Sequence, residues 1–340
     1  MAFNFWEAQR KARSRTKVYV FLFIFLVTVV AVCAEFLMRY LAAPDYDPPA
    51  PILGMGVAAI TFLVALYNYA MYRENGGGYV AESLGGIKID PLTRDFKQRQ
   101  LLNIVEEMSV SAGVPMPAVY VLPVNQINAF AAGLKKENAA VAVTSGCLAL
   151  LSRDELQGVI GHEFGHIYNG DMKISLQLAA MVMGFFFVLY LGLRIIQIAS
   201  FSSDRDGEDR RGGNPVAIAG LIFIIAGVLT WFFGSLLKAA ISREREYLAD
   251  ACAVQFTRNP EGIANALKKI GGQHVSDMPT RGMAFSHLYL DDRSGLSELF
   301  ATHPPLWKRI AAIEGLTYLP PEWKKDLPKG PDDSTKTDVA

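Results

Sequence analysis

The stretch Ser152–Gly170, SRDELQGVIGHEFGHIYNG, decides how the rest of this chain is interpreted. Ser152 followed three residues later by Glu155 forms a capping box, which predicts that a helix begins here. Gly170 supplies a stop signal at the other end. Inside this helix, His162-Glu163-Phe164-Gly165-His166 has the spacing H-E-x-x-H, so both imidazoles share one face, one turn apart. Such a pair can hold a zinc ion while the glutamate reaches an attacking water.

Two long apolar segments precede this helix in the sequence, and two follow it. Each approaches or exceeds the roughly 20 residues that a helix needs to cross a bilayer. The first could instead be a signal peptide, but its apolar run is longer than the ~7–15 residues of a signal core, which favours an uncleaved anchor. The third and fourth could also be core helices of a soluble domain, or hairpins that only dip into the bilayer. The segments are Val18–Met38, Ile52–Tyr72, Ile174–Ile198 and Val216–Leu237.

Basic residues mark the side of the membrane on which each loop lies. They precede the first segment and return after the second and the fourth, so the positive-inside rule predicts a cytoplasmic N-terminus. Four spans then place residues 73–173 and 238–340 in the cytoplasm as well, and both soluble parts share one compartment. The basic residues are Arg10, Lys11, Arg13, Arg15 and Lys17, then Arg73, then Lys238, Arg243 and Arg245.

The soluble parts carry signals for helices and strands. Gly76-Gly77-Gly78 predicts a flexible connection after the second span. Apolar spacing predicts a helix over Phe96–Ala112, closed by Gly113, and Ala118–Leu122 is typical of a strand. Two further β-rich runs, Asn128–Gly133 and Ala139–Thr144, predict a hairpin. The predicted order is a basic terminus (1–17), two spans (18–72), a soluble part (73–173), a membrane hairpin (174–237), a second soluble part (238–326) and a disordered tail (327–340).

Composition excludes several classes of function. Lys plus Arg and Asp plus Glu both number 33, so no overall basic field points to nucleic acid. The three cysteines form no CxxC pair, which favours a reducing compartment. A transporter or channel is disfavoured because the spans carry no convincing ion pair; Glu35 and Arg39 lie near one end of the first.

A zinc peptidase needs a third protein ligand and an open position for water. The extended motif H-E-x-x-H-x-x-G-x-x-H does not supply it, because Asn169 and Met172 replace its glycine and last histidine. A carboxylate on a second helix is another source: Glu246 and Asp250 are four apart and share a face, so one could bind zinc while the other orients a ligand histidine. That charged helix could equally be a solvated stem beside the membrane. The other candidates are His274, His287 and His303.

Four motifs in order along the chain resemble the M48 family of membrane metallopeptidases. The resemblance runs from about Gly85 to Leu316. It implies a mostly helical α+β fold: a zincin-like (gluzincin) protease domain with a small β-sheet, fused to about four transmembrane helices. The motifs are Asn128–Gly133 (NAFAAG), His162–His166 (HEFGH), Glu246–Asp250 (EYLAD) and Thr302–Pro305 (THPP).

The resemblance also assigns roles to single residues. It implies that His162, His166 and Glu246 bind one Zn²⁺ per chain, with Glu163 as the catalytic base and Asp250 as the partner of a ligand histidine.

Three further residues are placed near the site with less definite roles. The resemblance puts Asn128 on a strand beside the substrate cleft. His303 would approach the site and could stabilise the oxyanion, or His303-Pro304-Pro305 could simply be a turn that orients the last helix. Arg309, one turn beyond, could tie that helix to the site.

The activity so implied is that of a zinc metalloendopeptidase of the EC 3.4.24 type. It would hydrolyse membrane or misfolded proteins at the cytoplasmic face of a bacterial inner membrane, in quality control and the stress response. Its partners would be polypeptide substrates and the lipid bilayer, with no nucleic acid; the sequence specifies no oligomeric state. A scaffold that keeps zinc only for stability is disfavoured by Glu163, and a prenyl-peptide protease by having only four spans.

Overall fold

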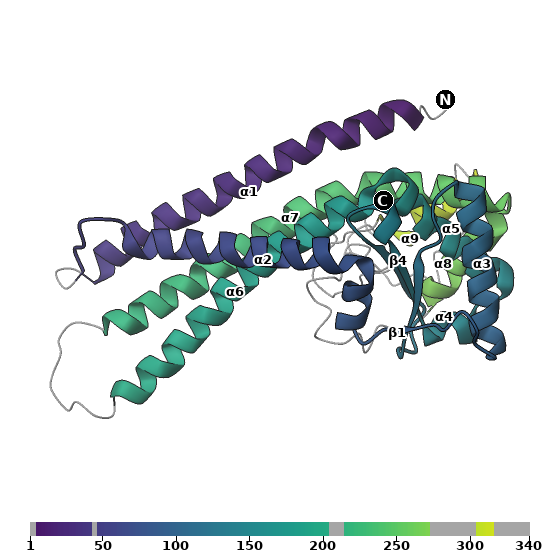
Figure 1. Ribbon diagram of the computed structural model, residues 1–340. Helices are drawn as coiled ribbons and strands as arrows, with labels where there is room; N and C mark the ends of the chain where they lie inside the picture. The colour runs from purple at the N-terminus through teal and green to yellow at the C-terminus, as the bar shows by residue number, and fades with distance from the viewer. Residues whose placement is uncertain (1–4, 43–45, 204–213, 273–303, 316–340) are drawn as a thin grey trace, which may run out of the picture. The chain divides into compact units, whose positions relative to one another are not determined.

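The computed structural model describes residues 5–42, 46–203, 214–272 and 304–315 (Figure 1). His274, His287, His303 and the tail 327–340 lie outside these ranges. The chain divides into two compact units. One comprises residues 1–75 and 173–240, and the other comprises residues 76–172 and 241–340. The expected class is confirmed: a mostly helical α+β protein with a small sheet and four apolar helices.

The first unit is built from long apolar helices. Each of the four contains a stretch that is long and apolar enough to cross a bilayer: Val20–Leu41, Ile52–Ser83, Asp171–Ser200 and Pro215–Gly234. Large apolar side chains such as Phe36 remain exposed on them (75%), as expected of a surface that faces lipid. The helices are α1 (Phe5–Leu41), α2 (Ile52–Ser83), α6 (Asp171–Ser203) and α7 (Pro215–Thr257).

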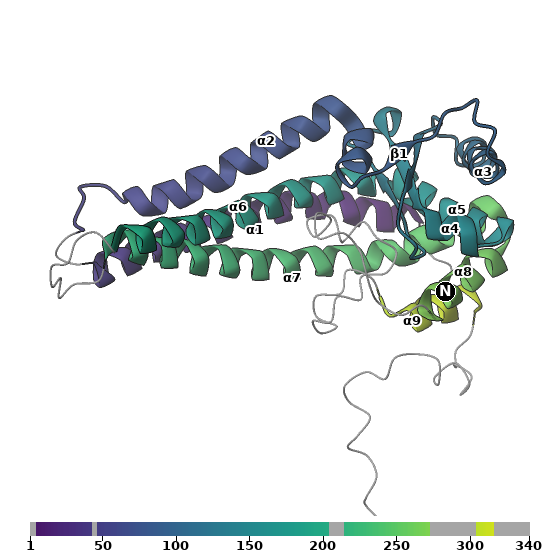
Figure 2. The same ribbon diagram turned by 90° about the horizontal axis from the view of Figure 1, so that it is seen from below.

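Small residues let these helices approach one another closely. α6 and α7 run side by side (Figures 1 and 2), and a Cβ added at Gly227 of α7 would come within 2.6 Å of the Leu189 backbone on α6. At Gly184 of α6 an added Cβ would lie 2.6 Å from the Thr61 carbonyl oxygen on α2. Glycine at such positions is typical of helix packing in membranes, where close backbone contact replaces the hydrophobic effect.

Glu35 and Arg39 form part of a closed polar network at one end of α1. Arg39 Nε donates to Glu35 Oε1 at 2.9 Å. The backbone N–H groups of Leu53 and Gly54 donate to Glu35 Oε2 at 3.0 and 3.1 Å, and the Tyr46 hydroxyl contacts the same oxygen at 3.2 Å. Glu35 therefore satisfies the first turn of α2, a structural role that accounts for a buried carboxylate without ion transport.

The second unit contains a four-stranded sheet of order β1-β2-β4-β3. β2 and β4 are parallel, and each outer strand is antiparallel to its neighbour. The predicted hairpin is present as β3 and β4, joined across the short helical turn Lys136–Asn138. β1 was not predicted, because two residues are too few to show an alternating pattern. The strands are β1 (Ile87–Lys88), β2 (Ala118–Leu122), β3 (Ala129–Ala132) and β4 (Ala140–Thr144).

The flexible connection predicted at Gly76-Gly77-Gly78 is wrong. α2 continues to Ser83 and bends at Gly76, whose φ of 67° lies in the left-handed region. A Cβ added at Gly77 would lie only 2.0 Å from the Ala132 carbonyl oxygen at the end of β3. These glycines therefore serve a bend and a close contact between helix and sheet, rather than flexibility.

The core of the second unit is formed by the sheet and the helices α3 (Phe96–Ala112), α5 (Arg153–Asn169) and α8 (Pro260–Gly272). α5, the helix predicted from Ser152–Gly170, packs against α3, α8 and β3. Glycines on α5 allow this crowding. A Cβ at Gly158 would lie 2.5 Å from the Ile263 nitrogen on α8, and one at Gly165 would lie 2.9 Å from Ala249 Cα on α7. The shorter helices are α4 (Ser145–Leu150) and α9 (Leu306–Ile313).

Candidate metal centre

α5 begins and ends where the sequence predicted. The Ser152 nitrogen donates to Glu155 Oε2 at 2.7 Å, and the Ser152 side chain accepts from the Glu155 nitrogen, which completes the capping box. Lys269 of α8 donates to the same glutamate at 2.7 Å. Burial alone would raise the pKa of Glu155, but the hydrogen bonds from Lys269 and Ser152 outweigh it and hold the pKa below its ordinary value. The charged carboxylate thus fixes the start of α5 to α8, and Gly170 ends the helix in the left-handed conformation.

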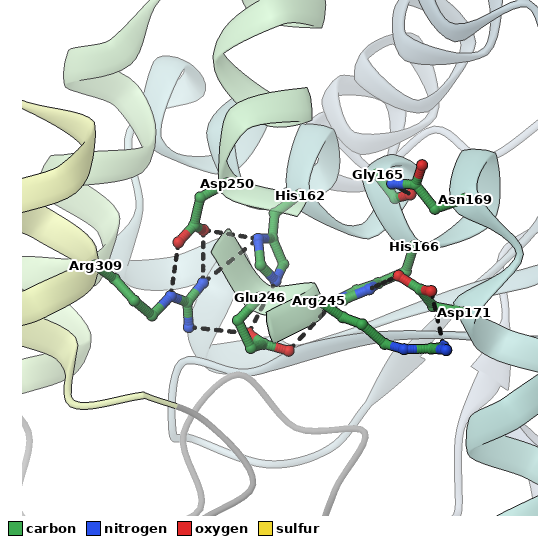
Figure 3. Close-up of polar contacts among 9 residues, drawn as sticks. All are labelled: His162, Gly165, His166, Asn169, Asp171, Arg245, Glu246, Asp250 and Arg309. Atoms are coloured by element: carbon green, nitrogen blue, oxygen red, sulfur yellow. Dashed lines mark hydrogen bonds and ion pairs between the residues drawn. The ribbon is translucent and has the colours of Figure 1, made fainter. Parts of the chain in front are cut away.

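His162 and His166 on α5 face Glu246 on α7 (Figure 3). His162 Nε2 lies 3.5 Å from Glu246 Oε2, and His166 Nε2 lies 3.6 Å from Glu246 Oε1. One ligand atom from each residue lies within 4.8 Å of the other two. His162 and Glu246 are 1% and 2% exposed, whereas the His166 side chain is 18% exposed and gives the cluster its more accessible side.

Asp250 and Arg309 hold the far side of His162. Asp250 Oδ1 lies 2.9 Å from His162 Nδ1. Arg309 of α9 donates from Nη2 to Asp250 Oδ1 at 2.7 Å and from Nε to Oδ2 at 2.9 Å. Its Nη1 also lies 3.3 Å from Glu246 Oε2. Arg309 is fully buried, and its guanidinium contacts both carboxylates and ties α9 to α7.

The pKa values of these groups follow from this arrangement. Burial by itself lowers the pKa of His162, but its hydrogen bonds to Asp250 and Glu246 prevail and raise the pKa to about 9. Burial would raise the pKa of Asp250, yet the charge and hydrogen bonds of Arg309 lower it to about 2. Asp250 is therefore ionised at neutral pH. An ionised Asp250 accepts a hydrogen bond from His162 Nδ1 and leaves Nε2 directed toward Glu246.

His166 has a corresponding partner in Asp171. Asp171 Oδ2 lies 3.2 Å from His166 Nδ1, and Arg245 Nη1 donates to Asp171 Oδ1 at 2.8 Å. Burial lowers the pKa of His166, but the hydrogen bond to Asp171 outweighs this effect and the net pKa is raised. Both candidate ligand histidines thus have one ring nitrogen facing Glu246 and the other facing a buried aspartate (Figure 3).

This set of residues fits a catalytic zinc ion. Two imidazole nitrogens and one carboxylate oxygen are a known ligand set of zinc peptidases. In a tetrahedral site with bonds of about 2.0–2.2 Å, ligand atoms lie roughly 3.3–3.6 Å apart. The two histidine nitrogens lie 3.5 and 3.6 Å from Glu246, each from a different oxygen of its carboxylate. One ligand atom from each of the three residues lies within 4.8 Å of the other two, so the cluster is close enough to converge on one ion. Aspartates on the distal histidine nitrogens are also usual at such sites.

The structure describes two of the three remaining predicted site residues, Glu163 and Asn128. Glu163 lies between the histidines on α5 and is 2% exposed. Asn128 immediately precedes β3 and is 3% exposed. Its side-chain oxygen accepts a hydrogen bond from the backbone nitrogen of Ala129 at 2.9 Å, and its backbone nitrogen donates to Thr144 Oγ1 at 3.0 Å. Its role toward substrate remains a prediction. His303 lies outside the described residues.

Sequence reasoning missed Asp171 and Arg245 and gave Arg309 only a secondary role. A signal for Asp171 was present, because it follows the helix-ending Gly170 and lies five residues after His166. Arg245 directly precedes Glu246, but no local pattern pairs it with Asp171, 74 residues away.

Three comparisons relate the chain to known proteins. The model of peptidase family M48 matches residues 95–317. The Protease HtpX homolog of Caldanaerobacter subterraneus subsp. tengcongensis is 38% identical over 270 residues, covering 77% of this chain and 86% of that protein. The Protease HtpX homolog of Streptococcus uberis is 37% identical over 262 residues, covering 76% and 85%. The crystal structure of S. mikatae Ste24p has a TM-score of 0.45 and 18% identity, covering 90% of this chain and 67% of that one.

The family model covers the part of the chain that contains the candidate metal centre. The matched residues 95–317 include both halves of the cluster and the apolar helices between them. The chain therefore belongs to peptidase family M48 and is a membrane metalloendopeptidase with several candidate membrane spans.

Proposed function

We propose that this protein is a zinc-dependent endopeptidase that cleaves membrane or misfolded proteins at the cytoplasmic face of the membrane, in protein quality control. The observation that carries the proposal is the convergence of His162, His166 and Glu246, with Glu163 on the same helix as the histidines. Two apolar helical stretches lie in the chain between His166 and Glu246. A soluble protease would not need two membrane-spanning helices in the sequence between the residues of its metal site. Their presence favours substrates at the membrane.

The chemistry follows from the residues of the cluster. His162, His166 and Glu246 would hold a zinc ion, whose Lewis acidity would lower the pKa of water and polarise the scissile carbonyl. Glu163 accepts a proton as the water oxygen adds to the carbonyl carbon. It returns that proton to the nitrogen as the C–N bond breaks, so the products are a carboxylic acid and an amine. Asp250 and Arg309 keep the His162 ring in place while the charges change.

For substrate binding we propose the segment around Asn128. It directly precedes β3, which packs against α5, the helix that carries the two histidines. An extended peptide bound there through backbone hydrogen bonds would tolerate many sequences, since side chains contribute little to that mode of binding. Broad specificity suits an enzyme that removes misfolded proteins. A scaffold that merely stores zinc is the weaker proposal, because a structural site has no need of Glu163.

Removal of the metal tests the proposed chemistry. We expect 1,10-phenanthroline to reduce casein cleavage by the purified protein in detergent to background, and about one equivalent of Zn²⁺ to restore it. Mg²⁺ should not restore it, because that ion prefers oxygen ligands. The control is the same chelator saturated with zinc beforehand. Full activity in protein shown by metal analysis to be zinc-free would contradict the proposal.

The proposed orientation is tested with topology reporters. We expect green fluorescent protein fused after Ala340 to fluoresce, because that end is cytoplasmic in the proposed topology. Alkaline phosphatase, which is active only outside the cytoplasm, should be active when inserted after Asp45 or within residues 204–213. Inactive phosphatase at both insertion points, together with an active phosphatase fused after Ala340, would show that the orientation is reversed.

A further inference from the structure

Each of the two candidate zinc histidines faces its own aspartate, and each aspartate is paired with its own arginine. His162 contacts Asp250, which Arg309 holds at 2.7 and 2.9 Å. His166 contacts Asp171 at 3.2 Å, and Arg245 holds Asp171 at 2.8 Å. The first pair contains Asp250, which the resemblance already assigns. The second pair, Asp171 and Arg245, has no role in the chemistry described so far.

The second pair is built into the site from both sides. Asp171 is the first residue of α6, directly after the left-handed Gly170 that ends α5. Arg245 lies on α7, directly before Glu246. Asp171 and Arg245 are 5% and 8% exposed, so their ion pair is shielded from water. The contact therefore connects the segment carrying the histidines to the segment carrying the carboxylate ligand (Figure 3).

The two oxygens of Asp171 are used separately. Oδ2 faces His166 Nδ1, and Oδ1 accepts from Arg245 Nη1. A carboxylate can accept at both atoms. With Oδ2 accepting, the proton of the neutral imidazole sits on Nδ1 and the lone pair sits on Nε2, the nitrogen that faces Glu246. Arg245 prevents the carboxylate from rotating away.

We propose that Asp171 and Arg245 are positioning residues that hold His166 in the tautomer and orientation required to bind the metal. The inference rests on the zinc site of the proposed function. Neither residue touches substrate; Arg245 acts through Asp171, and Asp171 acts through His166.

This arrangement predicts an unusual response to Asp171→Asn. An asparagine side chain has one oxygen, and Arg245, which can only donate, draws that oxygen toward itself. The amide NH₂ then faces His166 Nδ1 and favours the tautomer with its proton on Nε2, which cannot bind zinc through Nε2. Adding Arg245→Gln removes this bias, because glutamine can also accept and the amide can turn its oxygen to His166.

The experiment measures Zn²⁺ affinity of the full-length protein in detergent by competition with a chromophoric chelator. The variants are Asp171→Asn, Arg245→Gln and the double variant, and the matched control is Asp154→Asn, an exposed aspartate in the first turn of α5. The thermal midpoint of each metal-free protein is recorded alongside. The visible spectrum of the Co²⁺ form reports the ligand geometry independently of activity.

We expect Asp171→Asn to weaken Zn²⁺ binding by about 10–100-fold and to alter the Co²⁺ spectrum, as loss of an outer partner of a ligand histidine does. Arg245→Gln, which leaves the contact with His166 in place, should weaken binding less. The double variant should bind Zn²⁺ more tightly than Asp171→Asn alone. If the pair served folding alone, the thermal midpoints of the metal-free variants would fall, and the double variant would have the lowest midpoint.

Two results would overturn the inference while leaving the proposed function intact. If Asp171→Asn and Arg245→Gln both bind Zn²⁺ as tightly as the wild type, the pair does not position His166. If the double variant binds no better than Asp171→Asn, the tautomer argument is wrong. Wild-type protein that binds no zinc at all would instead contradict the proposed function, and this inference with it. If Asp171→Asn fails to fold, a Zn²⁺ affinity of Arg245→Gln equal to that of the wild type still shows that the pair does not position His166.

Discussion

Glu163→Gln should abolish peptide cleavage while leaving zinc bound. Glutamine has nearly the shape of glutamate but cannot accept a proton from water at neutral pH. General-base groups typically contribute about 10²–10⁴-fold to the rate, so we expect kcat for casein to fall by that factor with little change in KM. Zinc content should stay near one per chain, because the three proposed ligands are untouched.

The control for this substitution is Glu106→Gln, an exposed glutamate on α3 that also loses one charge. It should retain wild-type kcat. Wild-type cleavage by Glu163→Gln with zinc bound would mean that another group handles the proton. Loss of zinc together with activity would instead identify Glu163 as a ligand, and the assignment of the cluster would have to change.

The parts of the fold that the sequence predicted are those with local signals. Ser152 and Gly170 mark the ends of α5 by capping chemistry that needs no distant partner, and both ends are confirmed. The strand Ala118–Leu122 agrees with the structure residue for residue, because prolines bound an apolar run. The four apolar helices follow from length and composition alone.

The parts that could not be predicted depend on tertiary contacts. The glycines at 76–78 looked like a linker, since the sequence does not show that Gly77 lies against the Ala132 carbonyl. In the candidate metal centre, two proposed ligands and the proposed base came from one pentapeptide, whereas the family resemblance was needed to choose Glu246. Asp171 and Arg245 pair across 74 positions, and each alone resembles an ordinary surface charge. The resemblance placed Asp250 and Arg309 at the site, but not the contact between them, which spans 59 positions.

Glu246→Ala should remove the metal itself. The change deletes one of three proposed ligands and leaves only His162 and His166. Loss of an outer partner of a ligand typically costs 10–100-fold in metal affinity, so we expect loss of the ligand to exceed about 100-fold. Cleavage should disappear because the protein no longer holds zinc at the concentrations used. The bidentate contact of Arg309 with Asp250 remains, so the metal-free variant should still fold.

Thermal unfolding separates loss of metal from loss of structure. Zn²⁺ that binds only the folded state raises the midpoint of the wild type, by an amount that grows with the ratio of free zinc to Kd. We expect this rise in the wild type and in Glu261→Ala, an acidic residue of α8 that serves as the matched control, and no rise in Glu246→Ala. Tight zinc binding by Glu246→Ala would show that the third ligand lies elsewhere. If His303→Ala then lost the metal, the histidine of the Thr302–Pro305 motif would take the place assigned to Glu246.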